Sequence, residues 1–297
     1  IEVADGALLL LRSEVLDNRA EGTSAEGGGI YVRDIVTVID SRVAGNRASG
    51  DGGGIIQESS GGRMTVIRSE ITDNIAGGGS FPGNGGGLLA DGGPLFLVSS
   101  LVAGNSLLPG AYGGGGEGGG IKADEPAVIV ASTISGNSVQ GDLGEGGGIF
   151  SDEALTLVNA TVAGNRADKG AGVLVRSAGE IVNSTLTGNL AENGGGGVFA
   201  LPNTTLSIAN SLVLGNASDA GANDLEGDQA FAGAALDTTG GGNLFGAAPA
   251  GFDTQSLGGG DAVIDGADAA ALGGVFAMVG PDPATGVTAG LLGDMLG

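Results

Sequence analysis

Hydrophobic and polar positions alternate with a period of two in short segments that recur along most of the chain. Two aliphatic residues lie ten and eight positions before an asparagine, as Val36 and Val38 do before Asn46. The residue between them is more often polar than not, and Thr37 is an example. A further aliphatic residue, Val43 in this repeat, lies three positions before the asparagine. Alternation by two is typical of a β-strand with one buried face.

The asparagines define a repeat with spacings of 28, 28, 31, 32, 28, 24 and 27 residues. They are Asn18, Asn46, Asn74, Asn105, Asn137, Asn165, Asn189 and Asn216. A glycine triplet, Gly-Gly-Gly or once Gly-Ala-Gly, ends 17 to 20 residues before each asparagine from the second onward and is followed by an aliphatic residue. The length variation therefore falls between each asparagine and the next triplet, which predicts a fixed frame with one corner that accepts insertions.

A single repeat of this kind cannot bury its apolar face alone, so we expect the repeats to stack. The prediction is an all-β fold, a right-handed parallel β-helix of about eight to ten coils, with three short strands in each coil and a rise of roughly 4.8 Å. A helical solenoid is disfavoured because glycine triplets interrupt every candidate helix. We assign residues 1–227 to regular repeats and residues 228–297 to degenerate last coils with an irregular C-terminal cap or extension.

The asparagines and glycines are expected to be structural. Asparagine tolerates the left-handed conformation of a turn, and stacked amides can form a ladder between coils. A row of ligand amides is the alternative. The triplets permit positive φ and close backbone approach, and no Lys-Ser or Lys-Thr follows them as in a phosphate loop. Serines five positions before most asparagines are expected to fill a small site at a corner.

These motifs resemble the repeats of the polymorphic outer membrane protein family. That family alternates F-x-x-N with G-G-A-[ILV]. Here Val43 to Asn46 and Gly52 to Ile55 show the same order, with an aliphatic residue in place of Phe and a third Gly in place of Ala. The resemblance covers residues 1–227. It implies a secreted or surface-displayed bacterial β-helix, extracellular or attached to the cell surface, and in some members an autotransporter passenger.

Composition narrows the function classes. The net charge is −23, from 34 acidic and 11 basic residues, and such a chain repels nucleic acid and anionic lipid. Cysteine and histidine are absent, which removes disulfides, thiolate metal sites and the usual near-neutral general base. No run of about 18 apolar residues suggests a membrane span. The chain is therefore not expected to be an enzyme.

Two candidate sites remain. Stacking places the insertions on one edge, where per-repeat variation often marks a binding face; the two longest insertions carry Phe81 and Tyr112. These rings are predicted to hold a glycan or partner chain, or to belong to flaps that pack on each other. The pairs Asp124-Glu125 and Asp152-Glu153 lie at equivalent places in neighbouring coils, where calcium could bridge them or where they form a solvated acidic ridge. No other cofactor is expected.

The sequence favours a secreted or cell-surface structural or adhesive β-helix. Its partner is predicted to be itself, end to end or laterally in a filament or matrix, or another surface protein or a glycan. A polysaccharide-binding or polysaccharide-degrading enzyme on the same scaffold is the alternative. Such an enzyme needs clustered carboxylates on one strand face, whereas the acidic residues here fall mainly at turns.

Overall fold

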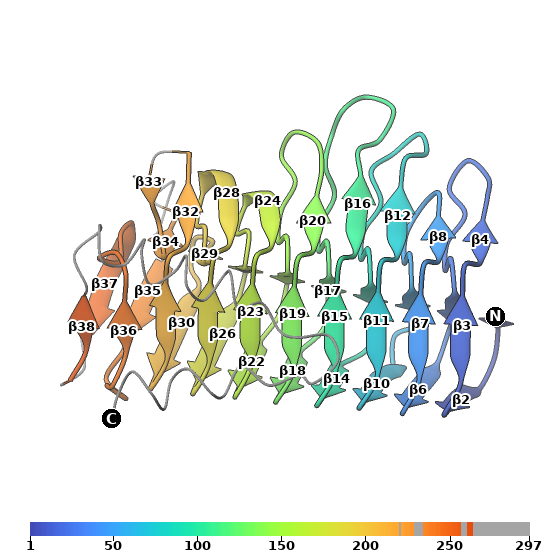
Figure 1. Cartoon of the computed structure of the whole chain (residues 1–297), viewed down its shortest axis with the longest axis horizontal. Coiled ribbons are helices and arrows are strands. Elements are labelled where there is room, and N and C mark those ends of the chain that lie inside the picture. The colour runs from blue at the N-terminus through green and yellow to red at the C-terminus, as the bar shows by residue number, and fades with distance from the viewer. Residues whose placement is uncertain (220, 229–233, 257–259, 264–297) are drawn as a thin grey trace.

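The computed structural model describes residues 1–219, 221–228, 234–256 and 260–263. Every regular element in these ranges is a β-strand, and the strands form four sheets that stack the coils along one axis (Figure 1). All strand pairs between successive coils are parallel, except for the hairpin of β32 and β33. The chain is therefore a parallel β-helix, as predicted.

The first two sheets of each coil are here named sheets A and B. Sheet A contains nine strands, β1 (Glu2–Val3), β5 (Ile30–Val32), β9 (Ile55–Gln57), β13 (Leu88–Ala90), β17 (Ile121–Ala123), β21 (Ile149–Ser151), β25 (Val173–Val175), β29 (Val198–Ala200) and β34 (Leu225–Gly227). Sheet B contains ten, β2 (Ala7–Leu11), β6 (Ile35–Ile39), β10 (Arg63–Ile67), β14 (Leu95–Val98), β18 (Ala127–Val130), β22 (Leu155–Val158), β26 (Ala178–Val182), β30 (Thr205–Ala209), β35 (Ala234–Asp237) and β37 (Phe252–Ser256).

Sheets C and D follow in each coil. Sheet C contains β3 (Glu14–Leu16), β7 (Arg42–Ala44), β11 (Glu70–Thr72), β15 (Leu101–Ala103), β19 (Thr133–Ser135), β23 (Thr161–Ala163), β27 (Thr185–Thr187), β31 (Leu212–Leu214), β36 (Leu244–Phe245) and β38 (Ala262–Val263). Sheet D contains β4 (Arg19–Ala20), β8 (Arg47–Ala48), β12 (Ile75–Gly77), β16 (Ser106–Leu108), β20 (Ser138–Val139), β24 (Arg166–Lys169), β28 (Leu190–Gly194), β32 (Ala217–Ser218) and β33 (Gly221–Ala222).

Our prediction of three strands per coil was wrong, because the residues after each asparagine form sheet D. Its strands contain only two to five residues, too few to display a period of two in the sequence. Small side chains such as Ala76 and Ala167 pack there with Leu107 and Val139 in a separate apolar cluster. The insertion loops leave from this sheet and rise above the stack (Figure 1).

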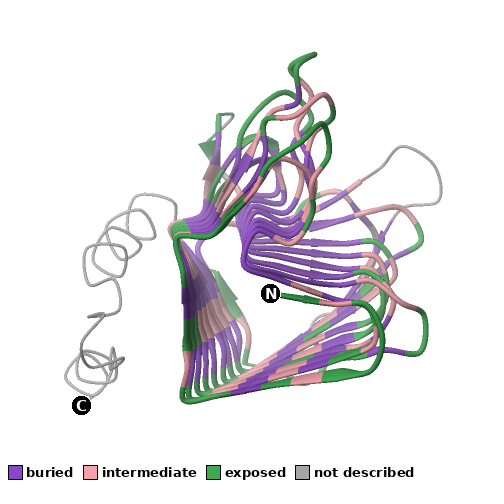
Figure 2. Cartoon of the chain, turned by 90° about the vertical axis from the view of Figure 1, so that its right-hand side faces the viewer, coloured by how far each residue is buried: buried purple, intermediate pink, exposed green. Residues whose placement is uncertain are grey.

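The main core fills the space enclosed by sheets A, B and C, where equivalent residues stack in register (Figure 2). Met64 pairs with Leu95 and Val66 with Leu97, and all four side chains are fully buried. Because each coil repeats the inward positions of the one before, aliphatic side chains form continuous columns through the stack. The apolar residues that alternate in the sequence are the inward-pointing residues of these columns.

The eight asparagines lie between sheets C and D and form a ladder. Both Asn105 N–H and its Nδ2–H donate to Oδ1 of Asn137, each at 3.0 Å, and Nδ2–H also donates to the Ile71 carbonyl at 2.9 Å. Gly104, just before the rung, has φ of 66°, a conformation that favours glycine. A Cβ on Gly87 would lie 2.9 Å from the Asn105 amide, so the triplet needs glycine where it faces the rung.

The serines form a second ladder, between sheets B and C. The Ser41 N–H donates to Ser69 Oγ at 3.1 Å, and the Ser69 N–H donates to Ser100 Oγ at 3.1 Å. The Ser69 hydroxyl donates to the Ile67 carbonyl at 2.8 Å. These hydroxyls satisfy backbone groups at a corner where the ladder of a sheet is interrupted.

The asparagine ladder ends in a carboxylate. Leu225 pairs with Val198, which places Asp224 at the position that Gly197 occupies one coil earlier. Asp224 Oδ1 accepts from Asn216 N–H at 3.0 Å and Nδ2–H at 2.9 Å, as the asparagine of a following coil would. Beyond this point sheet A ends at Gly227, whereas sheets B and C continue through β37 and β38. Residues 264–297, where we predicted a cap or extension, lie outside the described residues.

Candidate binding site: the charged cleft over sheet A

The middle residue of each sheet A strand points away from the core. These residues form a row, here named the sheet A row, which consists of Tyr31, Ile56, Leu89, Lys122, Phe150, Leu174, Phe199 and Glu226. The six central members are at least nine-tenths buried although they lie outside the main core. Row members and the residues beside the triplets cover one another, since Phe150, Leu174 and Phe199 pack together and Lys122 contacts Glu117.

Polar residues flank the row on both sides. The side nearer sheet D carries the residue that precedes each of the first six glycine triplets, Glu26, Asp51, Asn84, Glu117, Glu145 and Lys169. The other side carries the residue two positions after each of the first six row members, Arg33, Glu58, Asp91, Asp124, Asp152 and Arg176. The row and its two flanks are here named the sheet A cleft. Acidic residues outnumber basic ones along it.

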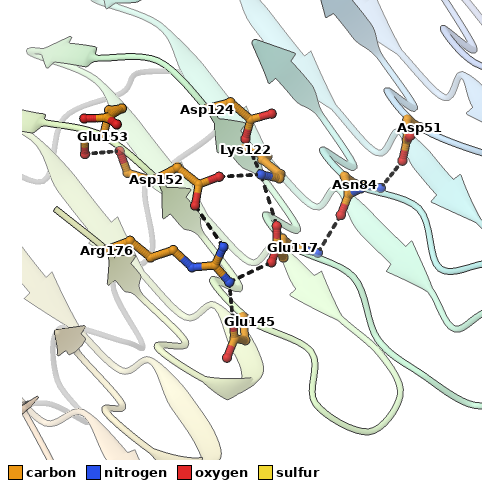
Figure 3. Close-up of polar contacts among 10 residues, drawn as sticks. Asp51, Asn84, Glu117, Lys122, Asp124, Glu145, Asp152, Glu153 and Arg176 are labelled. Atoms are coloured by element: carbon orange, nitrogen blue, oxygen red, sulfur yellow. Dashed lines mark hydrogen bonds and ion pairs between the residues drawn. The ribbon is translucent and has the colours of Figure 1, made fainter. Parts of the chain in front are cut away.

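Lys122 lies at the centre of an ion cluster in this cleft (Figure 3). Its Nζ lies 3.0 Å from Glu117 and 2.9 Å from Asp152, and it also contacts Asp124. The side chain is only 8% exposed, so an ammonium here requires partners. Burial alone would lower the pKa of Lys122, but the hydrogen bonds that its ammonium donates to Asp124 and Asp152 outweigh it, and the pKa is raised.

Arg176, two coils beyond Lys122, connects the same acids. Its guanidinium nitrogens lie 2.9 Å from Asp152, 3.0 Å from Glu117 and 3.4 Å from Glu145. The guanidinium also lies 4.6 Å from the centre of the Phe150 ring, and Lys122 Nζ lies 4.9 Å from that centre. The buried ring therefore stabilises two cations through its π face.

The two aspartates of the cluster titrate differently. Burial and a hydrogen bond with Asp91 raise the pKa of Asp124 to about 7. Burial also acts on Asp152, but hydrogen bonds with Lys122 and Asp124 and the charge of Arg176 outweigh it, so its pKa is lowered. Neighbouring carboxyl groups with diverging pKa values divide into an acid and a base at neutral pH.

Towards the N-terminal end the cleft becomes more acidic. Burial raises the pKa of Asp51, which accepts a 2.6 Å hydrogen bond from Asn84 N–H. Glu58 contacts the Tyr31 hydroxyl and lies 3.5 Å from Arg33. Cavities of about 590 Å³ beside Tyr31 and about 470 Å³ beside Phe199 open at the two ends. The cleft thus offers acidic side chains above an apolar floor.

The structure brings two of the four acids proposed for calcium into this cluster. Asp124 and Asp152 both contact Lys122, whose ammonium takes the place between them. Glu125 and Glu153 are exposed and belong to none of the cluster's ion pairs. Within the described residues, no three acidic side chains are arranged to hold a metal ion. Calcium at these positions stays a prediction.

Phe81 and Tyr112 lie on the insertion edge and are 67% and 90% exposed. Their loops do contact each other, since Ala111 N–H donates to the Gly79 carbonyl at 3.0 Å. The contact is made by backbone and leaves both rings free of the core. The insertion edge therefore combines packed loops with exposed aromatic side chains.

Lys122, Phe150, Arg176 and Glu117 do not stand out as site residues in the sequence. One signal was present, because a charged or amide residue precedes six of the seven triplets. The cluster also depends on the second residue after each triplet, which is the middle residue of a sheet A strand and points away from the core. This arrangement becomes clear only once sheet D has been identified.

Comparisons with protein-family models, curated proteins and solved structures gave no match. Among the described residues, no helix is long and apolar enough to cross a bilayer.

Proposed function

We propose that the chain is a secreted or cell-surface structural and adhesive β-helix that binds neutral or amino-bearing polysaccharide at its insertion edge. Support comes from the separation of two parts in one molecule. The frame is uniform, with an asparagine rung in each of eight successive coils and aliphatic columns inside. The loops differ from coil to coil and lie on one edge (Figure 1). Binding residues commonly lie on variable loops held by a rigid scaffold.

The observation that carries the proposal is the exposure of Phe81 and Tyr112 on neighbouring insertion loops. Exposed aromatic rings in a largely polar edge provide rigid, amphipathic contact area for a flat partner such as a sugar ring. Aromatics form only 3% of the chain, so their occurrence on the two longest insertions is informative.

Charge narrows the class of glycan. The net charge is −23, and the cleft beside the edge is lined mainly by carboxyl groups. Such a surface repels polyanions and attracts cationic ligands. Neutral or amino-bearing polysaccharides are therefore favoured over polyuronates.

Pull-down with insoluble chitin, cellulose and chitosan, and native gels containing polygalacturonate, test this proposal. We expect binding to at least one of the first three and none to polygalacturonate. The double variant Phe81→Ala/Tyr112→Ala should weaken binding about tenfold, or about 1.4 kcal/mol. Leu143→Ala, a 75% exposed residue on another insertion loop, is the matched control and should bind normally. Binding that is absent from all three, or unchanged in the double variant, would refute the proposal.

The alternative function, a polysaccharide-degrading enzyme, is favoured by the diverging pKa values of Asp124 and Asp152. Two carboxyl groups on adjacent coils match the requirement for an acid and a base. Their ion pairs with Lys122 and Arg176 favour a structural role instead. Release of reducing ends from a polysaccharide panel, abolished by Asp124→Asn and by Asp152→Asn, would establish the enzyme.

For self-assembly, we propose a lateral contact between copies. The last asparagine rung, where Asp224 accepts both hydrogen bonds of Asn216, does not mark the end of the stack, because sheets B and C continue beyond it through β37 and β38.

A further inference from the structure

The outward face of sheet B is almost free of charge, although the chain as a whole has a net charge of −23. From β2 to β35 its outward positions include only Arg63, Glu180 and Asp237 as charged residues. One column of outward residues is aliphatic in eight successive coils, Leu11, Ile39, Ile67, Val98, Val130, Val158, Val182 and Ala209.

Several of these outward side chains are open to solvent. Leu9 is 62% exposed, Leu11 43%, Phe96 38% and Ile35 36%. Together with the aliphatic column they form one continuous apolar patch. Monomeric proteins rarely expose such a patch without a partner.

We propose that this face, the outer surface of sheet B, packs against the same face of a second copy of the chain. Its size fits that role. Five residues give a width of about 17 Å and eight coils a height of about 38 Å, so the face offers roughly 650 Å² per copy. A stable specific interface buries about 800 Å² per partner, and smaller interfaces give weaker, transient dimers.

The distribution of charge also favours this face for contact between two copies, and it sets the relative direction of their coil axes. Two chains of net charge −23 repel each other, and the repulsion is smallest where uncharged faces meet. Arg63 lies in the third coil of the stack and Glu180 in the seventh, so they are equidistant from the fifth coil, which contains β18. A twofold axis along β18 packs the copies with antiparallel coil axes and places Arg63 of each beside Glu180 of the other.

This interface is independent of the insertion edge and of the proposed glycan binding. It uses a different sheet, and its readout is association rather than adhesion. The outcome of one test therefore does not decide the other.

Analytical ultracentrifugation of the full chain across micromolar concentrations tests the dimer. We expect a monomer–dimer equilibrium that Val130→Asp, in the aliphatic column of the fifth coil, weakens at least about tenfold. Thr133→Asp, a half-buried outward residue of sheet C in the same coil, is the control and should dimerise like the wild type. A wild-type chain that stays monomeric at several hundred micromolar, or a dimer insensitive to Val130→Asp, would overturn the proposal.

The antiparallel arrangement has its own test. Arg63→Glu and Glu180→Arg should each weaken the dimer, and the double variant should restore it. Failure of the double variant would overturn this arrangement. Because the chain has no cysteine, Val130→Cys should cross-link between copies with a short bismaleimide, and Thr133→Cys should not. Slow maleimide labelling of Val130→Cys in a monomeric sample would instead show that the same chain covers the face, and would overturn the proposal.

Discussion

The outer faces of sheets A and B belong to the same coils, yet they carry opposite chemistry. On sheet A, buried charged residues have partners of opposite charge, as Lys122 has in Glu117 and Asp152. Among the described residues no insertion extends from sheet B, and its outward positions are aliphatic or hydroxylated with few charges. An ammonium can be buried only where several acids surround it. The cluster forms on sheet A because the last residues of two insertion loops, Glu117 and Glu145, lie beside its strands and pair with Lys122 and Arg176.

Loss of a central asparagine should have the largest effect, because both faces depend on the ladder. Asn105→Ala removes the acceptor of the buried Asn74 N–H and Nδ2–H groups. Unsatisfied buried donors cost about 1–3 kcal/mol each, so we expect a loss of about 4 kcal/mol in the free energy of unfolding, measured by urea denaturation. Asn18→Ala, at the exposed first rung, is the control and should cost far less. Equal costs at both positions would argue against the ladder as the main support of the frame.

The next largest loss of stability is expected on sheet A, and an equivalent substitution on sheet B should have no effect. Lys122→Met leaves Asp124, Asp152 and Glu117 without their central cation, and removal of one partner from a buried ion pair costs about 3 kcal/mol. Arg63→Met removes a cation from the outward face of sheet B, where the side chain is exposed, and should leave the urea midpoint unchanged. If both variants lose similar stability, the buried cluster has no special role in holding the sheet A cleft.

The pH dependence of stability should follow Asp124. Its folded pKa of about 7 lies above the reference value of 3.8, so its stabilising contribution is complete below pH 3.8 and lost as the pH rises through 7. Asp152 has a lowered pKa, so its contribution is present above pH 3.8 and lost as the pH falls through the folded value.

Melting temperatures between pH 4 and 8 therefore test the pair. Asp124→Asn should remove the decline in stability towards pH 7. Asp152→Asn should instead remove stability that the wild type has at neutral pH. Identical pH profiles for wild type and Asp124→Asn would contradict the assignment.

Calcium removal should have the smallest effect. Lys122 already neutralises Asp124 and Asp152, and Glu125 and Glu153 are exposed. We expect the same melting temperature with chelator and with millimolar calcium. A rise with calcium that Asp124→Asn abolishes would favour the calcium site over the lysine-centred cluster.

The fold was largely predictable, whereas the cleft was not. The distance from triplet to asparagine is nearly constant because the backbone frame is the same in each coil. Within that frame a triplet glycine must leave room for the asparagine that it faces, as Gly87 does for Asn105. The ion cluster depends on side chains that meet from different coils, such as Glu117 and Arg176, which are 59 residues apart. Such contacts follow from insertion length and loop path, which local periodicity does not encode. Sheet D was not predicted for a related reason, since its strands of two to five residues are too short to show an alternation.

Our central claim has two parts. The stacked coils fold without help from the insertion loops, and the insertion loops form the edge that binds polysaccharide. Replacing residues 107–116 by Ala-Asp copies the short loop of Arg166–Lys169 and keeps Ser106 and Glu117. We predict that this variant melts close to the wild type and loses about tenfold in affinity for the polysaccharide that the wild type binds best. Unchanged affinity in a folded variant, or loss of folding, would contradict the claim.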